Sequence, residues 1–461
     1  MALSASTVLE VRADGSDDNG GGFVTGGAGT DRSQQAAAHA TLTAASVVHS
    51  TTTQINVAAG DYTVTALDVD NLFQITGGTA TAGVYHITVA DTANNRWTVD
   101  RSAGTAGQTV VGRMGGAYAS PGKAAAVMTA AGMISWVRSG SYSITSTTSN
   151  ITGGRIALGV ANTRMIGYDT TRGDETGVQP TFTATVNTMT LITTSNDVFV
   201  GNIKLSAGSA TGITGTNSSA GCVLYKIRMT GANTTAAFRG GTNSHHLLCE
   251  ATGGTVTGFN GEGGHFFGCV AKAIVGRGFQ AGGSIETIFM HCISINHTGG
   301  TGKGFDLGTA TGSAMYINCT AFGNSQSNFD NSSGPVAACQ WINCLSYSAG
   351  LNGFNGGGRA WNCASGNSNT DDFGTAVIQI NCETLTADPF TDASDLDFSL
   401  NSVAGGGTVC RGMGLLGVFP PLVSTSGNLD AGAAQSTGIS TATVNSRHVL
   451  LALPRTWVIE N

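Results

Sequence analysis

Two aspartates in the second half of the chain have the residue type and spacing for acid/base chemistry. Asp306 and Asp330 each directly follow a phenylalanine, Phe305 and Phe329. If these phenylalanines point inward on strands, the aspartates point outward, one above the other on neighbouring strands. Two carboxylates stacked in this way would approach the ~5–5.5 Å separation of a retaining glycosidase. The same positions are also typical of a solvated ladder of turn residues, because Asp and Asn favour turns.

Two other groups could take part in catalysis. Glu262 and His265 lie close together in a glycine-rich segment and could form an acid/base pair, or simply belong to an exposed loop. A polysaccharide lyase would need a base, and Arg277, Lys303 and Arg359 fall one per repeat near a turn. Single basic residues on a solvated rim are equally common, so both interpretations stay open.

Metal and cofactor sites are not expected from this sequence. Asp17 and Asp18 are adjacent, as are Asp371 and Asp372, but neighbours on a strand face opposite ways and cannot share an ion without a turn. There is no C-x-x-C pair, and no G-x-S-x-G, Walker A or H-E-x-x-H motif. We therefore predict no cofactor, no bound metal and no catalytic residues. If the chain is an enzyme, Asp306, Asp330, Glu262 and His265 are the candidates.

These candidates belong to a repeat in which a cysteine precedes a phenylalanine by ten residues, or by thirteen in one case. The pairs are Cys249 with Phe259, Cys269 with Phe279, Cys292 with Phe305, Cys319 with Phe329, Cys344 with Phe354, and Cys363 with Phe373. Short alternating apolar runs and a turn residue before most phenylalanines indicate strand, turn, strand and variable loop. Repeats of 19 to 27 residues match one coil of a parallel β-helix, counted between successive members of one set of eight cysteines: Cys222, Cys249, Cys269, Cys292, Cys319, Cys344, Cys363 and Cys382.

The cysteines are interpreted as structural. They recur once per coil, and free cysteine is among the residues most often buried. Coils stack about 4.8 Å apart, so the cysteines and phenylalanines would form inner ladders along the axis. A column of reduced thiols fits synthesis in the cytoplasm.

Between residues 40 and 118 the repeat is absent. Hairpin-like segments such as Val84–Val89 and Trp97–Asp100 appear instead. We predict a small antiparallel β insertion here.

Motifs near both ends resemble those of pectate-lyase-like right-handed parallel β-helix proteins, of the kind found in tailed-phage virions. The quoted segments are Val11–Gly21, Ser120–Ala124 through Ser139–Tyr142, Ile166–Tyr168, Arg172–Asp174, Asp388–Phe390, Asp397–Leu400 and Asp430–Gln435. The resemblance spans roughly residues 8 to 435 and implies a cap helix that begins near Pro121. It concerns the fold, and one fold hosts many functions.

The predicted fold is therefore all-β: a right-handed parallel β-helix with an N-terminal cap helix and a small antiparallel β insertion. The predicted parts are a strand and cap (1–39), the insertion (40–118), the cap helix and first coil (119–150), the β-helix (151–435) and a capping or oligomerisation extension (436–461).

Charge limits the choice of partners. The net charge is −7 with 21 Lys plus Arg among 461 residues, and no basic stripe is present, so a nucleic-acid partner is not expected. Met1–Arg12 lacks a secretory signal pattern, and the apolar run Val449–Leu453 is too short to span a bilayer. We therefore expect no membrane span.

The function predicted from these features is that of a non-enzymatic virion protein of a tailed phage, such as a capsid decoration, fibre or spike. It would be made in the host cytoplasm and displayed on the virion surface as a homotrimer that contacts other virion proteins. Host surface polysaccharide is a candidate ligand. The alternatives are a polysaccharide depolymerase, either hydrolase or lyase, and a bacterial surface adhesin.

Overall fold

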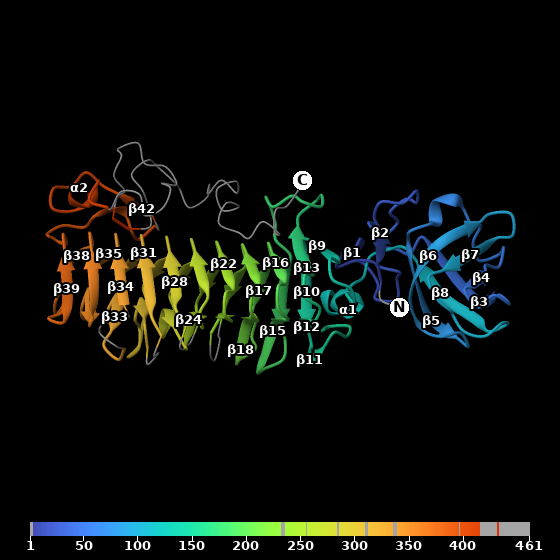
Figure 1. Ribbon diagram of the computed structural model, residues 1–461, viewed down its shortest axis with the longest axis horizontal. Helices are drawn as coiled ribbons and strands as arrows, with labels where there is room; N and C mark the ends of the chain where they lie inside the picture. The colour runs from blue at the N-terminus through green and yellow to red at the C-terminus, as the bar shows by residue number, and fades with distance from the viewer. Residues whose placement is uncertain are drawn as a thin grey trace. The chain divides into compact units, whose positions relative to one another are not determined.

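The structure of the protein is a computed structural model (Figure 1). It describes residues 3–231, 236–254, 256–283, 285–308, 312–334, 339–395, 397–414 and 431–432. The chain divides into two compact units, Met1–Ser244 and His245–Asn461, and each is described by itself. No helix in the described ranges is long and apolar enough to cross a membrane.

The first unit begins with a strand pair and a short helix. Strand β1 (Thr7–Val11) pairs antiparallel with β2 (Gly22–Val24) and parallel with β9 (Ile134–Arg138). Helix α1 (Pro121–Val127) packs against β1 and β9, as expected for the predicted cap. The Ser120 hydroxyl accepts a hydrogen bond from the Lys123 amide at 3.2 Å, which satisfies a free donor of the first turn.

Six antiparallel strands between Ala40 and Met114 close into a small barrel in the first unit. Their order is β3 (Ala40–Val48), β4 (Gln54–Asn56), β7 (Arg96–Val99), β6 (Gly83–Asp91), β5 (Leu72–Gly78) and β8 (Thr109–Met114). The rings of Phe73 and Trp97 are both fully buried in its core, with centroids 5.3 Å apart. The barrel confirms the antiparallel element predicted from the hairpin-like segments.

The rest of the first unit consists of parallel strands in three sheets. The first sheet continues from β9 to β13 (Arg164–Tyr168), β16 (Phe199–Gly201) and β19 (Val223–Tyr225). The second contains β10 (Ser141–Ile144), β14 (Thr181–Ala184), β17 (Lys204–Ser206) and β20 (Arg228–Thr230). The third contains β11 (Ser146–Ser149), β12 (Gly154–Leu158), β15 (Met189–Thr194), β18 (Ile213–Asn217) and β21 (Phe238–Gly240).

The second unit likewise contains three parallel sheets, drawn as rows of parallel arrows in Figure 1. The first contains β22 (His245–Leu247), β25 (His265–Phe267), β28 (Thr287–Met290), β31 (Ala314–Ile317), β34 (Cys339–Ile342), β37 (Gly358–Trp361) and β39 (Val377–Ile380). The second contains β23 (Glu250–Thr252), β26 (Val270–Lys272), β29 (Ile293–Ile295), β32 (Thr320–Phe322), β35 (Leu345–Tyr347), β38 (Ala364–Gly366) and β40 (Glu383–Leu385). The third contains β24 (Thr257–Gly261), β27 (Arg277–Ala281), β30 (Phe305–Asp306), β33 (Phe329–Asn331) and β36 (Phe354–Gly356). Each coil crosses the three sheets in turn, so the fold is the predicted parallel β-helix.

The predicted phenylalanine ladder is present in the second unit. The ring of Phe279 on β27, for example, lies between those of Phe259 and Phe305, with centroids 4.8 and 4.7 Å away. All successive rings stack with centroids 4.7–5.1 Å apart and interplanar angles of 3–9°. Five members are fully buried, and the last is half-buried; in chain order they are Phe259, Phe279, Phe305, Phe329, Phe354 and Phe373.

A second aromatic ladder, which the sequence did not reveal, rises beside the first. It runs through Phe266, Phe289 and Tyr316, with centroids 4.9 and 5.1 Å apart. The two ladders meet edge to face, as between Phe279 and Phe289 at 5.6 Å and between Phe305 and Tyr316 at 5.5 Å. Such pairs are favourable beyond the area they bury.

The cysteine column is also present, and it has a second role. From Cys269 to Cys382, each thiol donates a hydrogen bond to the carbonyl oxygen of the residue three positions before the preceding cysteine, at 3.2–3.5 Å. Burial raises the pKa of Cys269, Cys319 and Cys363, which keeps these thiols protonated as donors. Cysteine therefore fills a small apolar space and also bonds one coil to the previous one.

A left-handed backbone corner precedes most of these cysteines. Asn318, Asn343, Asn362 and Asn381 have φ of 52–54°, and His291 has φ of 51°. Asparagine tolerates this region better than most residues, because its short polar side chain can hydrogen-bond locally. The corner turns the chain from the first sheet into the second, which explains the recurring Asn-Cys pair.

The last described part of the second unit covers the outside of the coil. Strands β41 (Phe390–Asp392) and β42 (Asp397–Leu400) form an antiparallel hairpin. Phe390 and Phe398 pack against Phe322 at 5.8 and 6.1 Å, in a cluster with residues of the second sheet. The segments Asp388–Phe390 and Asp397–Leu400, which resemble motifs of β-helix proteins, therefore lie over the second sheet, although the β-helix was predicted to run to residue 435. The predicted extension 436–461 lies outside the described residues.

Replacing a central ring of the ladder should strongly destabilise the protein. We expect Phe305→Ala to lower the free energy of unfolding by about 3–5 kcal/mol, because the cavity lies between stacked coils that cannot collapse. The measurement is denaturant unfolding of the full chain. Val275→Ala is the control, since Val275 is 48% exposed. Equal effects of the two substitutions would contradict the ladder's role.

The left-handed backbone conformation of Asn318 predicts that glycine at this position is less destabilising than alanine. Asn318→Gly should be tolerated, whereas Asn318→Ala should cost about 1–2 kcal/mol, because alanine is strained at φ of 52°. Thermal unfolding of both variants tests this. The opposite order, with alanine the better residue, would show that the corner does not limit stability.

Candidate functional site

Asp306 and Asp330 are brought together as predicted, but they are not exposed. Asp306 on β30 pairs in register with Asp330 on β33, directly after the stacked Phe305 and Phe329. Their side chains are 1% and 2% exposed. The sequence places the two carboxylates correctly in the stack, while the side chains that cover them come from other positions of the coils.

Two basic residues neutralise this pair of carboxylates. Lys303 Nζ lies 3.1 Å from Asp306 Oδ1 and also forms an ion pair with Asp330 Oδ2. Arg277, on the preceding coil, forms an ion pair with Asp306 Oδ2. Burial alone would lower the pKa of Lys303, but the charges of Asp306 and Asp330 raise it above its ordinary value. Two of the basic residues considered as lyase bases thus act here as counterions.

Asp330 has further neutral donors. The Ser332 hydroxyl donates to Oδ2 at 2.9 Å, and the Asn355 amide, one coil further on, donates to Oδ1 at 2.6 Å. Both oxygens therefore accept hydrogen bonds. A general acid must carry a proton on one oxygen, and a base must have an oxygen directed at its substrate. The four charged residues form a compact neutral cluster with the geometry of a structural ion network.

Lys303 is a poor proton-abstracting base in this arrangement. Its ammonium is held by two carboxylates, and its raised pKa means that it stays protonated at neutral pH. Arg359, the third basic candidate, lies on β37 between Gln340 and Ile378 of the neighbouring strands. The structure therefore does not gather the three bases around one point.

His265 contacts a residue other than its predicted partner. Its ring lies against that of His245, with centroids 5.0 Å apart. Burial lowers the pKa of His265, and the charge of Glu286 partly offsets this effect. Glu262 lies beside Gly282 and Gly283 of the following coil. The Glu262/His265 pair remains a prediction.

The adjacent aspartates have structural partners. Asp17 accepts hydrogen bonds from the amides of Ala119 and Ser120 and from the Ser120 hydroxyl at 2.6–2.9 Å, and so supports the start of α1. Asp372 accepts from Ser365 and Ser368 at 3.3–3.4 Å. Within the described ranges, no three His, Cys, Asp or Glu residues are arranged to hold a metal ion.

A buried serine–histidine pair was not found from the sequence. The hydroxyl of Ser294 lies 2.8 Å from His297 Nε2, and both residues are fully buried. The Ile274 amide donates to Nδ1 at 3.1 Å, so the proton of the neutral ring must be on Nε2. The ring then donates to Ser294 and cannot accept its proton, which is the reverse of a catalytic dyad.

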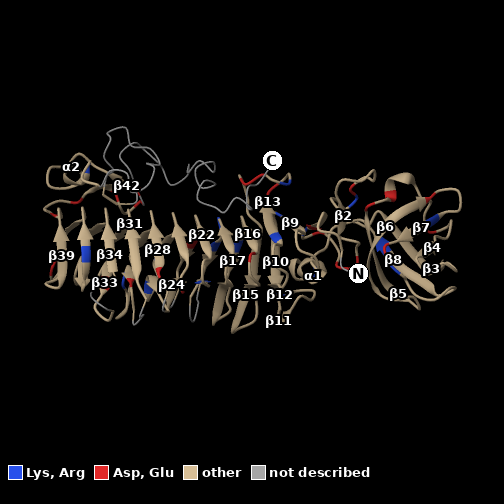
Figure 2. Cartoon of the chain, viewed as in Figure 1, with Lys and Arg blue, Asp and Glu red and all other residues tan. Residues whose placement is uncertain are grey.

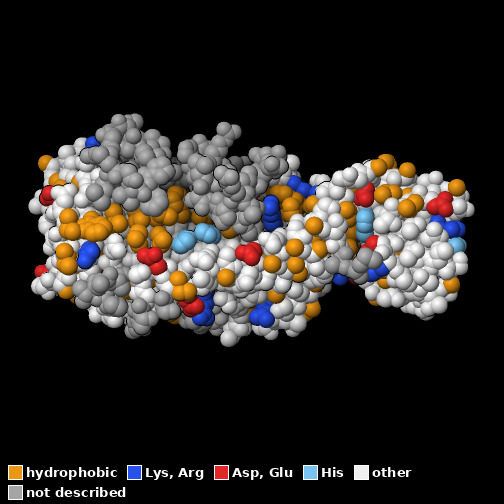
Figure 3. Space-filling view, in the orientation of Figure 1, with side chains coloured by type: hydrophobic (Ala, Val, Ile, Leu, Met, Phe, Trp, Pro, Cys, Tyr) orange, Lys and Arg blue, Asp and Glu red, His pale blue; other side chains and the backbone are white. Residues whose placement is uncertain are grey.

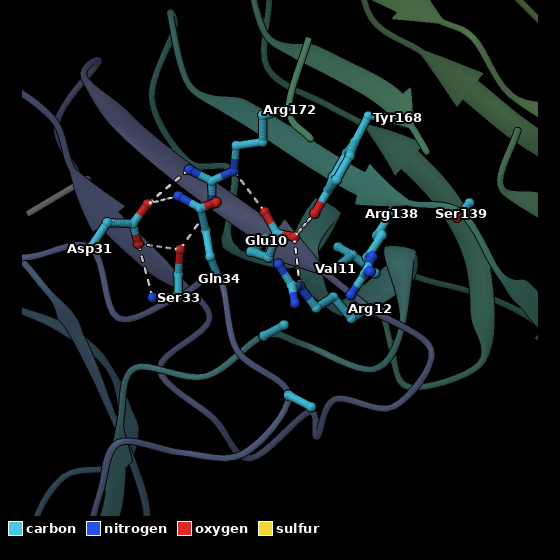
Figure 4. A network of polar contacts seen from close by, with 12 residues as sticks. Glu10, Val11, Arg12, Asp31, Ser33, Gln34, Arg138, Ser139, Tyr168 and Arg172 are labelled. Carbon is cyan, nitrogen blue, oxygen red and sulfur yellow. Dashed lines mark hydrogen bonds and ion pairs between the residues drawn. The ribbon is translucent and has the colours of Figure 1, made fainter. Parts of the chain in front are cut away.

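A second charged network joins the N-terminal strand to the coil in the first unit (Figure 4). Glu10 is fully buried and binds Arg12 at 3.0 Å, Arg172 at 2.7 Å and the hydroxyl of Tyr168. Arg172 also binds Asp31 at 2.8 Å. Residues of three motifs that resembled β-helix openings thus meet at one ion network, which indicates a structural function for them.

Comparisons with known proteins give the fold and little more. No family model matches the chain, and no curated protein matches it. The chain has a pectate-lyase-like parallel β-helix fold. The solved structures similar to it include pectate lyase Pel9A, with 16% identity, a TM-score of 0.49 and coverage of 68% of this chain and 90% of that one.

Two further structures are similar at lower levels. A rhamnogalacturonan lyase has 15% identity and a TM-score of 0.43, with coverage of 60% of this chain and 87% of that one. The ORF18 protein of Geobacillus virus E2 has 11% identity and a TM-score of 0.36, with coverage of 55% and 52%. At these levels the likeness concerns the fold and does not extend to an activity.

Removing Lys303 should destabilise the protein, because the buried carboxylates of Asp306 and Asp330 lose a cation. We expect Lys303→Met to lower the free energy of unfolding at pH 7 by about 3–5 kcal/mol, since two stacked carboxylates lose their shared cation. The triple variant with Asp306→Asn and Asp330→Asn should recover most of the loss at pH 7. No recovery would show that the lysine acts only through packing.

Buried histidines should make the protein acid-sensitive. Burial lowers the pKa of His246 and of His297 to about 3. The unfolded chain therefore binds protons below the ordinary pKa of 6.5, and the stability that is complete above this value is lost as the pH falls toward 3. Between pH 7 and pH 5 we expect a loss of about 2 kcal/mol per histidine.

Denaturant unfolding at both pH values measures this effect. His297→Asn should reduce the pH dependence, whereas His49→Asn, at a partly exposed residue, should leave it unchanged. Equal pH dependence in all three proteins would contradict the assignment.

Proposed function

We propose that this protein is a non-enzymatic surface component of a tailed-phage particle, namely a capsid decoration, fibre or spike. The observation that supports this most is the state of Asp306 and Asp330. They are the best-placed acids of the coil, and they are buried and ion-paired with Lys303 and Arg277. These stacked acids bind basic residues of neighbouring coils and do not form a row of exposed carboxylates. This arrangement suits a rigid structural solenoid.

The surface of the second unit fits a role in assembly. Charged residues are sparse along its strands (Figure 2). Strand β39 pairs with β37 on one side, and the described residues provide no strand on its other side. It carries Ile378 and Ile380, which are 51% and 47% exposed. An open strand edge with apolar side chains favours contact with another chain. We therefore propose a homotrimer that docks to other virion proteins, with host polysaccharide as the candidate ligand.

The virion assignment is tested on particles. Mass spectrometry of purified virions should find the chain among the particle proteins, and light scattering of the isolated protein should give three times the chain mass. Its absence from particles of the phage that encodes it would contradict the proposed function. A monomer in solution would contradict the trimer.

The alternative is a polysaccharide depolymerase, and the observation that favours it is the in-register stacking of Asp306 on Asp330. The double variant Asp306→Asn, Asp330→Asn separates the two functions. We expect wild type and double variant alike to leave capsular and pectin-like polymers intact, as followed by reducing ends and by absorbance of unsaturated products. Cleavage by wild type that the folded double variant loses would overturn the non-enzymatic proposal.

A further inference from the structure

His245 and His265 form an unusual pair within the stacked coils of the second unit. They lie in register on β22 and β25, so their side chains leave the sheet at the same position of adjacent coils. Their ring centroids are 5.0 Å apart, but the ring planes differ by 66°. The phenylalanines of the inner ladder, by contrast, stack within 9° of parallel. The two imidazoles therefore adopt an edge-on arrangement instead of the parallel stack of a ladder.

The ring nitrogens of this pair also differ from those of three other histidines. His86 is paired with Asp70, His49 with Thr51, and His297 with Ser294 and a backbone amide. For His245 and His265, the described part of the chain provides no hydrogen-bond partner at either ring. Both side chains are only partly buried. Figure 3 shows that some histidine side chains of the chain reach the surface.

Both rings are neutral at physiological pH. Burial and the neighbouring ring lower the pKa of His245 to about 4, and burial lowers that of His265. Glu286 is the charged side chain that acts on His265, and its negative charge favours a nearby cation. Neutral imidazole is the form that binds metals.

We propose that His245 and His265 form a two-histidine site for a divalent first-row transition-metal ion such as Ni²⁺ or Zn²⁺. Metal–nitrogen distances near 2.0–2.1 Å require the two nitrogens to converge on one point, and adjacent in-register side chains with edge-on rings are suited to this. Among the described residues, no third His, Cys, Asp or Glu completes a ligand group. Water fills the other positions, and the ion exchanges with solvent.

Titration of the EDTA-treated full chain with Ni²⁺ at pH 7, followed by calorimetry, tests the proposal. Ni²⁺ is chosen because imidazole suits it, while thiolates select softer ions. We expect one ion per chain. His245→Asn and His265→Asn should each weaken binding on the order of tenfold or more, and the double variant should abolish this site.

Two matched controls keep the result specific. His49→Asn removes a partly exposed histidine that already has a side-chain partner, and Cys382→Ser removes a thiol of the column that is only partly buried; neither should change the binding. Thermal unfolding without metal shows whether each variant is folded, and the pair His245→Gln, His265→Gln replaces the asparagines if they impair folding.

The proposal is overturned if the wild type binds no ion, or if the folded double variant binds as the wild type does.

Discussion

Stacking of like residues at the spacing between adjacent coils is the constraint on which the second unit depends. Parallel strands place each side chain directly above its counterpart, about 4.8 Å away. Flat aromatic rings suit that distance, and the rings from Phe259 through Phe279 to Phe373 stack at 4.7–5.1 Å. From Cys269 to Cys382, each thiol of the cysteine column reaches a carbonyl oxygen of the preceding coil. The core is therefore a set of columns, each using one kind of contact many times.

The same constraint creates an electrostatic problem wherever a column contains acids. Asp306 above Asp330 would place two negative charges within one coil spacing, which is unfavourable in a buried site. Lys303 lies between them and Arg277 binds the free side of Asp306, so the charges balance locally. The buried charge of Glu10 in the first unit is neutralised in the same way, by ion pairs with Arg12 and Arg172. In both places, charged residues that could be mistaken for a catalytic centre hold neighbouring chain segments together.

The proposed function follows from this use of charge. An enzyme of this fold needs acids or bases directed at a substrate, whereas the most regular carboxylates here accept hydrogen bonds from their own protein. The histidine pair is an exception, since its ring nitrogens have no partner among the described residues and its side chains are only partly buried. The side chains available to an external ligand are therefore the two histidines of the first sheet. Asp306 and Asp330 of the third sheet bind residues of the protein itself.

The repeat could be predicted from the sequence alone, because a column needs a similar residue type in every coil. The cysteines, the phenylalanines and the Asn-Cys pairs were visible in this way. So was the stacking of Asp306 on Asp330. The sequence could not show the second aromatic ladder, in which residue type changes from Phe289 to Tyr316. Nor could it show that Lys303 and Arg277 cover the aspartates, that β41 and β42 fold over the second sheet, or that His265 meets His245. Those outcomes depend on loop paths and side-chain directions between coils, which vary from repeat to repeat. Only the tertiary structure determines these features. The contacts of Lys303 and Arg277 show that the two aspartates, which could have been a catalytic pair, belong to a buried ion cluster.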